Sequence, residues 1–223
     1  MVELLGGANL AGVSCQVVPP GVPGYTPVCP YTRSPTTAGV WSGPDLARAR
    51  RLIAESGTAG ARVDLWGVAG LGNNVLEYGV RVLRRLGYRA RGRVVPDIGH
   101  YFPHIGDSRS KVQAGMYGWI PDFLTASSFL GPMTCRQLIP RSGANTNVSQ
   151  FCDPEIDSLV DRALEAGEAE AGTLWAEADR RVGEAAPIVP LVNRRNVLLV
   201  SDRVGNVQQH FQVGPLLDRL WVR

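Results

Sequence analysis

Residues 62–95 read RVDLWGVAGLGNNVLEYGVRVLRRLGYRARGRVV, and this stretch decides the fold class. Residues 62–68 and 88–95 alternate apolar and polar side chains, which predicts two strands. Between them, five apolar residues recur at the spacing of one helix face: Val75, Leu76, Val80, Leu83 and Leu86. A strand, a helix and a strand in about 35 residues indicate a βαβ unit with a right-handed crossover, and hence an α/β protein.

Patterns outside this unit predict further regular elements. Helices are expected to end at Gly57, to begin after the capping residue Asp153, and to run from about Glu168 to Ala185. Four segments have the composition of short strands: residues 113–119, 188–192, 196–201 and 216–222.

Four cysteines lie in two local pairs, at spacings of 14 and 17 residues: Cys15, Cys29, Cys135 and Cys152. Each pair lies in a turn-rich stretch that is expected to be a loop. Local pairing suggests two disulfides and therefore an oxidising compartment, and four buried free thiols are the alternative. Neither pair has the spacing of a zinc site, and there are only three histidines, so no metal is expected.

The net charge of +3 results from 23 basic residues, 22 of them arginine, and 20 acidic residues mixed among them. Solvated faces of an arginine-rich protein are the simpler interpretation, an acidic partner is the alternative, and no nucleic-acid partner is expected. No apolar run approaches the 18 residues of a transmembrane helix. Residues 1–7 lack the charged and apolar regions of a signal peptide, which conflicts with the cysteines and suggests a segment upstream.

Catalytic motifs are not found. No GxSxG elbow occurs, and Pro103 between His100 and His104 argues against helical spacing of two metal ligands. The segment Gly70–Asn74 lacks the third glycine of a dinucleotide fingerprint and the Gly-Lys pair of a phosphate loop, so it predicts an ordinary turn from strand to helix. We therefore expect neither an enzyme nor a cofactor.

The best candidate for a ligand site is the stretch Tyr117–Phe123, at the end of a predicted strand. Ligands of open α/β sheets bind at strand ends. The Asp122 carboxylate can pair with an ammonium group, and Trp119 can supply an apolar or cation–π wall. The alternative is a packed tryptophan and a solvated aspartate.

Several motifs then occur in the order of one known family. They are Cys15–Gln16 with Pro19–Gly21, Pro23–Tyr25, Cys29–Thr32, Trp41 with Pro44–Ala54, Gly118–Trp119 with Asp122, Phe151–Pro154, Ala186–Leu191 and Arg203–Asn206. In this combination the chain resembles, over essentially its whole length, the C-terminal part of a family 5 extracellular solute-binding protein. These proteins are the peptide, oligopeptide and nickel receptors of ABC importers, and the closest resemblance is to actinobacterial lipoprotein members.

The resemblance implies a periplasmic-binding-protein type II-like α/β fold, in which two lobes close on a ligand. Residues 1–195 would be the C-terminal lobe, and residues 196–223 would contain strands that return to an absent N-terminal lobe. In peptide-binding members an aspartate after a Gly-Trp pair binds the α-amino group of the ligand. That role falls on Asp122, beside Trp119, Gly118 and Tyr117.

The family also has a disulfide near this site, which the resemblance assigns to Cys135 with Cys152, and Cys15 with Cys29 would be a second. One departure concerns the ligand's other end. Dipeptide receptors place an arginine in the loop that corresponds to Gly67–Asn74, and this chain has no basic residue there. Longer or chemically different ligands are therefore favoured over free dipeptides.

The expected function is the ligand-binding component of an ABC importer, for peptides or another small molecule, acting by lobe closure without catalysis. Its partners would be a permease and the missing lobe, and membrane contact would come only through the permease or an upstream lipid anchor. The location would be extracytoplasmic. The alternative is a truncated or split-gene fragment, or a sensor domain, with no transport activity of its own.

Overall fold

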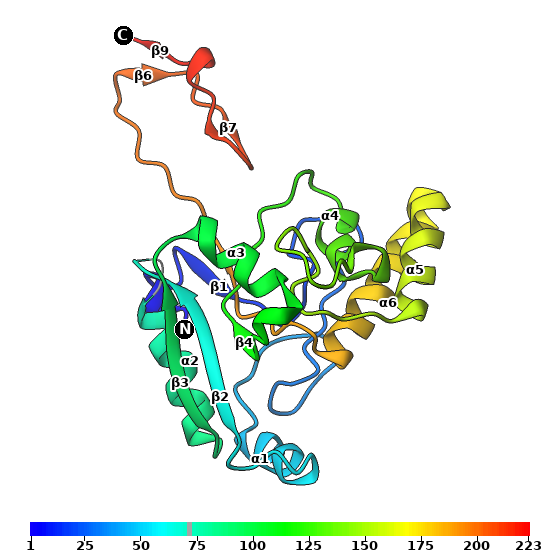
Figure 1. The fold of residues 1–223 in the computed structure, drawn as a ribbon. Helices are drawn as coiled ribbons and strands as arrows, with labels where there is room; N and C mark the ends of the chain where they lie inside the picture. Colours follow the sequence, from blue (N-terminus) through cyan, green and yellow to red (C-terminus); the bar gives the residue numbers. More distant parts are fainter. Residues whose placement is uncertain (71–72) are drawn as a thin grey trace.

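The computed structural model describes residues 1–70 and 73–223 and contains the βαβ unit where the sequence predicts it. β2 (Arg62–Val68) and β3 (Arg89–Val95) pair in parallel, and α2 (Asn73–Arg85) connects them (Figure 1). A two-residue strand, β4 (Ala114–Gly115), pairs in parallel with the other edge of β2. The sheet order is therefore β3-β2-β4, with the central strand first in sequence.

The apolar face of α2 packs on this sheet. Leu76 and Val80 from the helix are buried together with Leu65 and Ala90 from the strands. Gly79 permits the close approach, because a Cβ atom there would lie 2.7 Å from Leu65 Cδ2. These contacts form the smaller of two apolar cores and explain why the helical pattern of the sequence is reliable here.

The larger core lies between three further helices and the N-terminal loop: α4 (Ala126–Leu130), α5 (Pro154–Glu165) and α6 (Glu168–Ala185). α5 begins after Asp153, whose carboxylate accepts a hydrogen bond from the Glu155 N–H, as the sequence predicts. The most completely buried members of this core come from all these segments: Val18, Leu130, Met133, Ile156, Val160, Ala178 and Val182. No helix within the described residues is long and apolar enough to cross a membrane.

One expectation about helices is wrong. α3 (Ile98–Gly106) includes Pro103, so His100 and His104 do lie on one helix. A proline removes one backbone hydrogen bond, and the burial of Tyr101 and Ile105 holds the helix in place. His100 pairs with the capping residue Asp97, while His104 packs against Trp66, so the two rings have separate partners.

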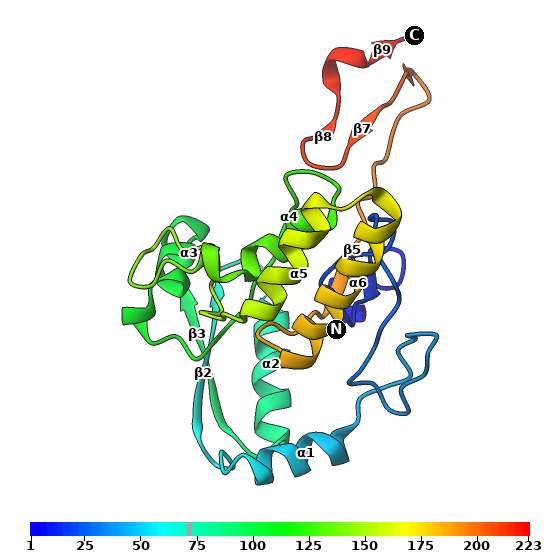
Figure 2. The same cartoon turned by 90° about the vertical axis from the view of Figure 1, so that its right-hand side faces the viewer.

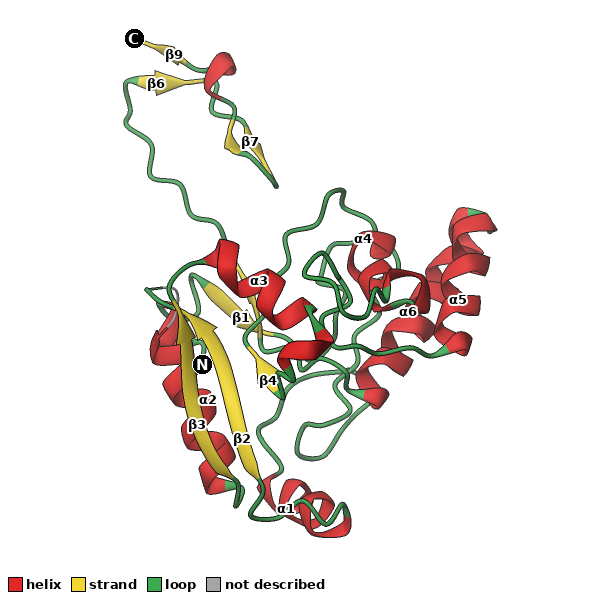
Figure 3. Ribbon diagram, viewed as in Figure 1, coloured by secondary structure: helices red, strands yellow, loops and turns green. Residues whose placement is uncertain are grey.

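The turn-rich N-terminal loop is held to α6 by the buried carboxylate of Asp179. This carboxylate accepts hydrogen bonds from the N–H groups of Val17 and Val18, at 2.9 and 3.2 Å, and from Gln16 Nε2 at 2.8 Å. Gln16 in turn accepts from the Val28 N–H and donates to the Thr26 carbonyl. Asp179 of α6 thus fixes the start of a loop that has no regular structure, and Gln16 links that start to residues 26–28 (Figure 3).

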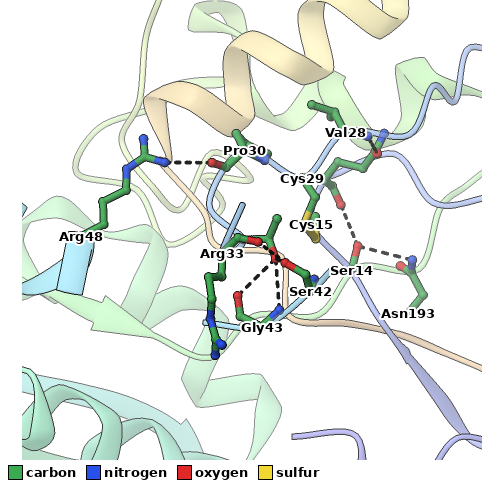
Figure 4. Close-up of a disulfide and its surroundings, with 12 residues drawn as sticks. Ser14, Cys15, Val28, Cys29, Pro30, Arg33, Ser42, Gly43, Arg48 and Asn193 are labelled. Atoms are coloured by element: carbon green, nitrogen blue, oxygen red, sulfur yellow. Dashed lines mark hydrogen bonds between the residues drawn. A yellow bond between two sulfur atoms is a disulfide. The ribbon is translucent and has the colours of Figure 1, made fainter. Parts of the chain in front are cut away.

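The same loop contains the Cys15–Cys29 disulfide, and the Cys135–Cys152 disulfide closes the loop before α5, so both expected pairs are joined. Figure 4 shows Ser14 beside the first disulfide, near Asn193 of β5 (Val192–Arg194). β5 pairs with β1 (Ala11–Val13) in an antiparallel ribbon. The first disulfide therefore lies next to the ribbon of β1 and β5, where the beginning and the end of residues 1–195 meet.

The last segment of the chain leads away from both cores (Figures 1 and 2). It contains four short strands in two antiparallel pairs: β6 (Val204–Gly205) with β9 (Trp221–Val222), and β7 (Gln209–His210) with β8 (Gly214–Pro215). Residues 196–201, predicted as a strand, have no strand partner, and Leu199 is 97% exposed. The strand prediction is wrong because extended chain becomes a strand only beside a neighbour.

Three other strands are shorter than predicted. Of residues 216–222, only Trp221–Val222 form β9, because Leu217–Arg219 form a 3-10 helical turn. Of residues 113–119, only Ala114–Gly115 pairs with β2, and of residues 188–192 only Val192 belongs to β5. After β4 the chain leaves the sheet, and Pro190 before β5 lacks the N–H group that a ladder requires. The short β4 leaves residues 116–125 as an irregular loop beside the sheet.

Replacing Asp179 by Asn should lower the free energy of unfolding by about 1–3 kcal/mol, because one amide oxygen cannot serve all three N–H donors. Chemical denaturation at pH 7 measures this change. The matched control is Asp218→Asn, whose exposed side chain predicts a change within about 0.5 kcal/mol. Equal effects of the two substitutions would contradict the anchoring role.

The effect of pH on the stability contributed by Asp179 has a defined sign. Burial raises the pKa of the Asp179 carboxyl above 3.8, against the effect of its N–H donors. The folded state then keeps its proton to higher pH than the unfolded state, so this group's contribution to stability falls as pH rises from 3.8 through the folded pKa. The stability difference between wild type and Asp179→Asn should therefore shrink between pH 4 and pH 7, as measured by denaturation at each pH.

Candidate functional site

The candidate site is the loop that follows β4, and α3 holds its start against the sheet. The Met116 N–H donates to the Trp66 carbonyl at 2.8 Å, which continues the pairing of β4 with β2. The Tyr101 hydroxyl of α3 lies 3.0 Å from the Trp66 carbonyl oxygen and 2.6 Å from that of Met116. Burial raises the pKa of Tyr101 to about 12, so this hydroxyl remains a donor at physiological pH.

Two aromatic side chains stack in this loop. The ring centroids of Tyr117 and Trp119 are 6.1 Å apart with an interplanar angle of 19°, and Phe102 of α3 meets Tyr117 edge-on at 6.0 Å. Burial raises the pKa of the Tyr117 hydroxyl to about 12. Trp119 keeps 36% of its surface exposed, so the stack is partly accessible to solvent.

Ser128 of α4 holds both predicted ligand-binding residues. Its backbone carbonyl accepts a hydrogen bond from Trp119 Nε1 at 2.7 Å, and its hydroxyl oxygen accepts one from the Asp122 N–H at 2.9 Å. The sequence analysis did not identify Ser128, since a serine six to nine residues downstream has no motif that links it to the loop. Only the folded structure shows that Ser128 is buried.

The carboxylate of Asp122 faces outward. Within the part of the chain that the structure describes, it makes no hydrogen bond or ion pair, while the backbone of the same residue is fixed. Three apolar neighbours in the loop are also exposed: Ile120, Phe123 and Leu124. A charged acceptor without a partner, beside an aromatic face and apolar side chains, can accept an ammonium group with an apolar substituent.

The structure brings Tyr117, Trp119 and Asp122 together on one loop. It gives no special role to Gly118, where a Cβ atom would meet nothing within 4 Å. The Cys135–Cys152 disulfide lies at the start of α5, on a surface hollow of about 520 Å³ that does not include the loop. A second hollow of about 490 Å³ lies between α2 and β3.

Among residues 1–70 and 73–223, no group of three or more histidine, cysteine, aspartate or glutamate side chains could hold a metal ion. The turn Gly70–Asn74 that the sequence analysis considered as a phosphate loop lies partly outside the described residues. The loop after β4 therefore remains the candidate site.

Comparisons with known proteins give one sequence relative and many structural ones, although no family model matches the chain. The chain is 28% identical over 93 residues to the peptide transport periplasmic protein SapA of Haemophilus influenzae, which covers 41% of this chain and 16% of SapA. Clavulanic acid biosynthesis oligopeptide binding protein 2 matches with a TM-score of 0.81 at 24% identity, over 99% of this chain and 40% of that one.

A third match is the periplasmic binding protein DppA from Helicobacter pylori, solved in complex with a peptide. Its TM-score is 0.77 at 17% identity, over 96% of this chain and 40% of that chain. This chain thus spans about 40% of the length of the solved structures. The expected resemblance to peptide-binding proteins and the expected α/β fold are confirmed, and the matched proteins are named for binding or transport rather than for catalysis.

Replacing Ser128 by Ala should release the Asp122 amide while the fold persists and the Ser128 carbonyl still accepts from Trp119 Nε1. Loss of one hydrogen bond predicts a decrease in unfolding free energy of about 1 kcal/mol. The Asp122 amide should exchange its hydrogen faster, as measured by hydrogen–deuterium exchange. The matched control is Ser127→Ala, because within the described residues the Ser127 hydroxyl forms a hydrogen bond with Thr125 alone. Unchanged protection of the Asp122 amide in Ser128→Ala would exclude Ser128 as the residue that positions the loop.

Proposed function

We propose that this chain is one lobe of the ligand-binding component of an ABC importer, and that its ligands are peptides with a free amino terminus. The observation that carries the proposal is the exposed Asp122 carboxylate, which has no ion-pair partner among the described residues, near Trp119 on a loop at the edge of the sheet. The similarity to proteins named for peptide binding and transport supports the same ligand class.

The proposed chemistry is recognition by charge and shape. An α-ammonium group would donate charge-assisted hydrogen bonds to the Asp122 carboxylate, at the 2.7–2.9 Å usual for such pairs. Trp119 would lie against the ammonium or the first side chain as an aromatic wall. The exposed side chains of Ile120, Phe123 and Leu124 favour apolar residues near the amino end of the ligand, since their burial would add a hydrophobic contribution.

The other end of the ligand is recognised elsewhere in this proposal. Residues 67–74 contain no arginine or lysine that could pair with a nearby ligand carboxylate. A free dipeptide would therefore leave its carboxylate unpaired, which is costly in a closed cleft. Longer peptides avoid that cost, because their carboxylate lies farther from Asp122.

Transport function would require closure of two lobes. A ligand held between them stabilises the closed state by its extra contacts, and a permease distinguishes the closed state from the open one. We assign residues 1–195 to the lobe that carries Asp122 and residues 196–223 to strands that pack on the other lobe. The exposure of Leu199 and the separate pairing of β6 to β9 support that assignment.

Two disulfides also support an extracytoplasmic location, because such bonds persist in oxidising compartments. A permease partner and an upstream lipid anchor fit this location. A fragment or sensor domain without transport activity would have the same fold. Measuring ligand binding by the protein that contains both lobes distinguishes a transport component from these alternatives.

Asp122→Asn should weaken binding of neutral tetrapeptides about 10- to 100-fold, the loss of one hydrogen bond to a charged group. Isothermal titration of the two-lobed protein measures the affinity. The control is Asp202→Asn, an exposed aspartate in residues 196–223 whose removal should leave the affinity unchanged.

An amino-acetylated tetrapeptide provides the second arm of this experiment. It should bind wild type as weakly as the free peptide binds Asp122→Asn, and the substitution should cause no further loss, because both changes remove the same pair. Equal affinity of wild type for free and acetylated peptides would rule out the amine-anchoring role of Asp122.

A further inference from the structure

The positive charge of the chain is concentrated in one stretch. Residues 46–95 contain ten arginines and only three acidic residues, whereas the remainder of the chain has more acidic than basic residues. The net charge of +3 therefore conceals a strongly basic α1–β2–α2–β3 region, where α1 is Leu46–Glu55. The sequence analysis attributed the arginines to solvated faces, and the structure shows where they gather.

Six of these arginines lie at the amino-terminal end of the sheet, and we call them the basic end: Arg50, Arg51, Arg62, Arg84, Arg85 and Arg89. They come from α1, the first residues of β2 and β3, and the last turn of α2. Two contacts join the turns after α1 and α2: the Gly60 N–H donates to the Gly87 carbonyl at 3.1 Å, and the hydroxyls of Thr58 and Tyr88 are 2.9 Å apart. Figure 1 shows α1 at the foot of the two strands.

These arginines lack carboxylate partners among the described residues. All six are exposed, and none forms an ion pair, whereas Arg91 and Arg93 farther along β3 both pair with Asp64. Arg62 and Arg89 are direct neighbours in the register of β2 and β3, an arrangement of like charges that costs stability. The fold therefore places these cations close together, and no carboxylate within the described chain neutralises them.

Some of the six have structural roles. Arg84 Nε donates to the Ala90 carbonyl, Arg89 Nε donates to the Gly60 carbonyl, and Arg85 in the last turn of α2 complements the helix dipole. Arg50 and Arg51 make no hydrogen bond through their side chains within the described residues. These contacts explain the positions of Arg84, Arg85 and Arg89, but not those of Arg50 and Arg51 in α1.

Exposed apolar side chains lie in and just before α1, near the arginines of the basic end. α1 has no fully buried residue. On its apolar face Leu46, Ala49 and Ile53 are partly buried, whereas Leu52 is 46% exposed. In the segment that leads to α1, Trp41 is also exposed. Exposed arginines next to an amphipathic helix and a tryptophan are the combination that interfacial membrane-binding surfaces use.

We propose that the basic end docks on an anionic phospholipid surface. Guanidinium groups bind phosphate through two parallel hydrogen bonds, and Leu52 and Trp41 would enter the headgroup region. This docking face lies at the amino ends of β2 and β3, whereas the Asp122 loop follows β4, so ligand and lipid would not compete. The sequence analysis expected membrane contact only through a permease or an anchor, and this contact is additional to both.

Vesicle sedimentation tests the proposal with the purified chain. Vesicles of phosphatidylcholine with 30% phosphatidylglycerol should bind the protein at low salt, and vesicles of phosphatidylcholine alone should not. Replacing Arg50, Arg51 and Arg85 by Gln should weaken binding about a hundredfold, at about fivefold per arginine. Leu52→Ser, which leaves the charge unchanged, should also weaken it.

The matched control removes the same charge elsewhere: Arg141, Arg194 and Arg203 to Gln, three exposed arginines without ion pairs within the described chain. This variant should bind as wild type does. Equal loss in both triple variants would overturn the proposal in favour of a general charge effect. Binding of soluble polyglutamate as tight as binding of the vesicles, with no effect of Leu52→Ser, would overturn it in favour of an acidic protein partner.

Discussion

The buried carboxylate of Asp179 is the contact on which the larger core depends. It satisfies two backbone N–H groups and one side-chain amide of a loop that is about 160 residues distant in sequence. Without it, those donors would be buried without partners, a cost comparable to a large fraction of a domain's stability. Because the loop is fixed at residues 16–18, Val18 reaches the centre of the core between α5 and α6.

The next parts of the structure continue along the chain from this anchored loop. The Cys15–Cys29 disulfide and Gln16 fix the loop's far end, and the chain then passes to α1 and the sheet. The sheet has a different role at each end: the loop after β4 presents the Asp122 carboxylate, and the amino ends of β2 and β3 gather arginines. Within the described residues neither the Asp122 carboxylate nor these arginines form an ion pair, so each end of the sheet presents exposed charge to solvent.

Ser128 shows how a buried neighbour prepares an exposed site. Its hydroxyl and carbonyl oxygens accept hydrogen bonds from Asp122 and Trp119, so the loop backbone is ordered while the carboxylate stays in solvent. For the ligand proposed above, a loop already in position would reduce the entropy lost on binding. The stacking of Tyr117 on Trp119 has the same effect on the aromatic wall.

The sequence by itself determined three helices and the βαβ unit: α2, α5 and α6 lie where their apolar spacing and caps place them, β2 has the predicted bounds, and β3 begins one residue later than predicted. A helix closes its hydrogen bonds within a few residues, so its signal is local. Only the tertiary structure decided the rest. Residues 113–119 and 196–201 have strand composition but mostly lack a neighbour, and Asp179 and Ser128 acquire their roles from residues that the fold brings to them. Strand pairing and burial depend on partners distant in sequence, which no local pattern identifies.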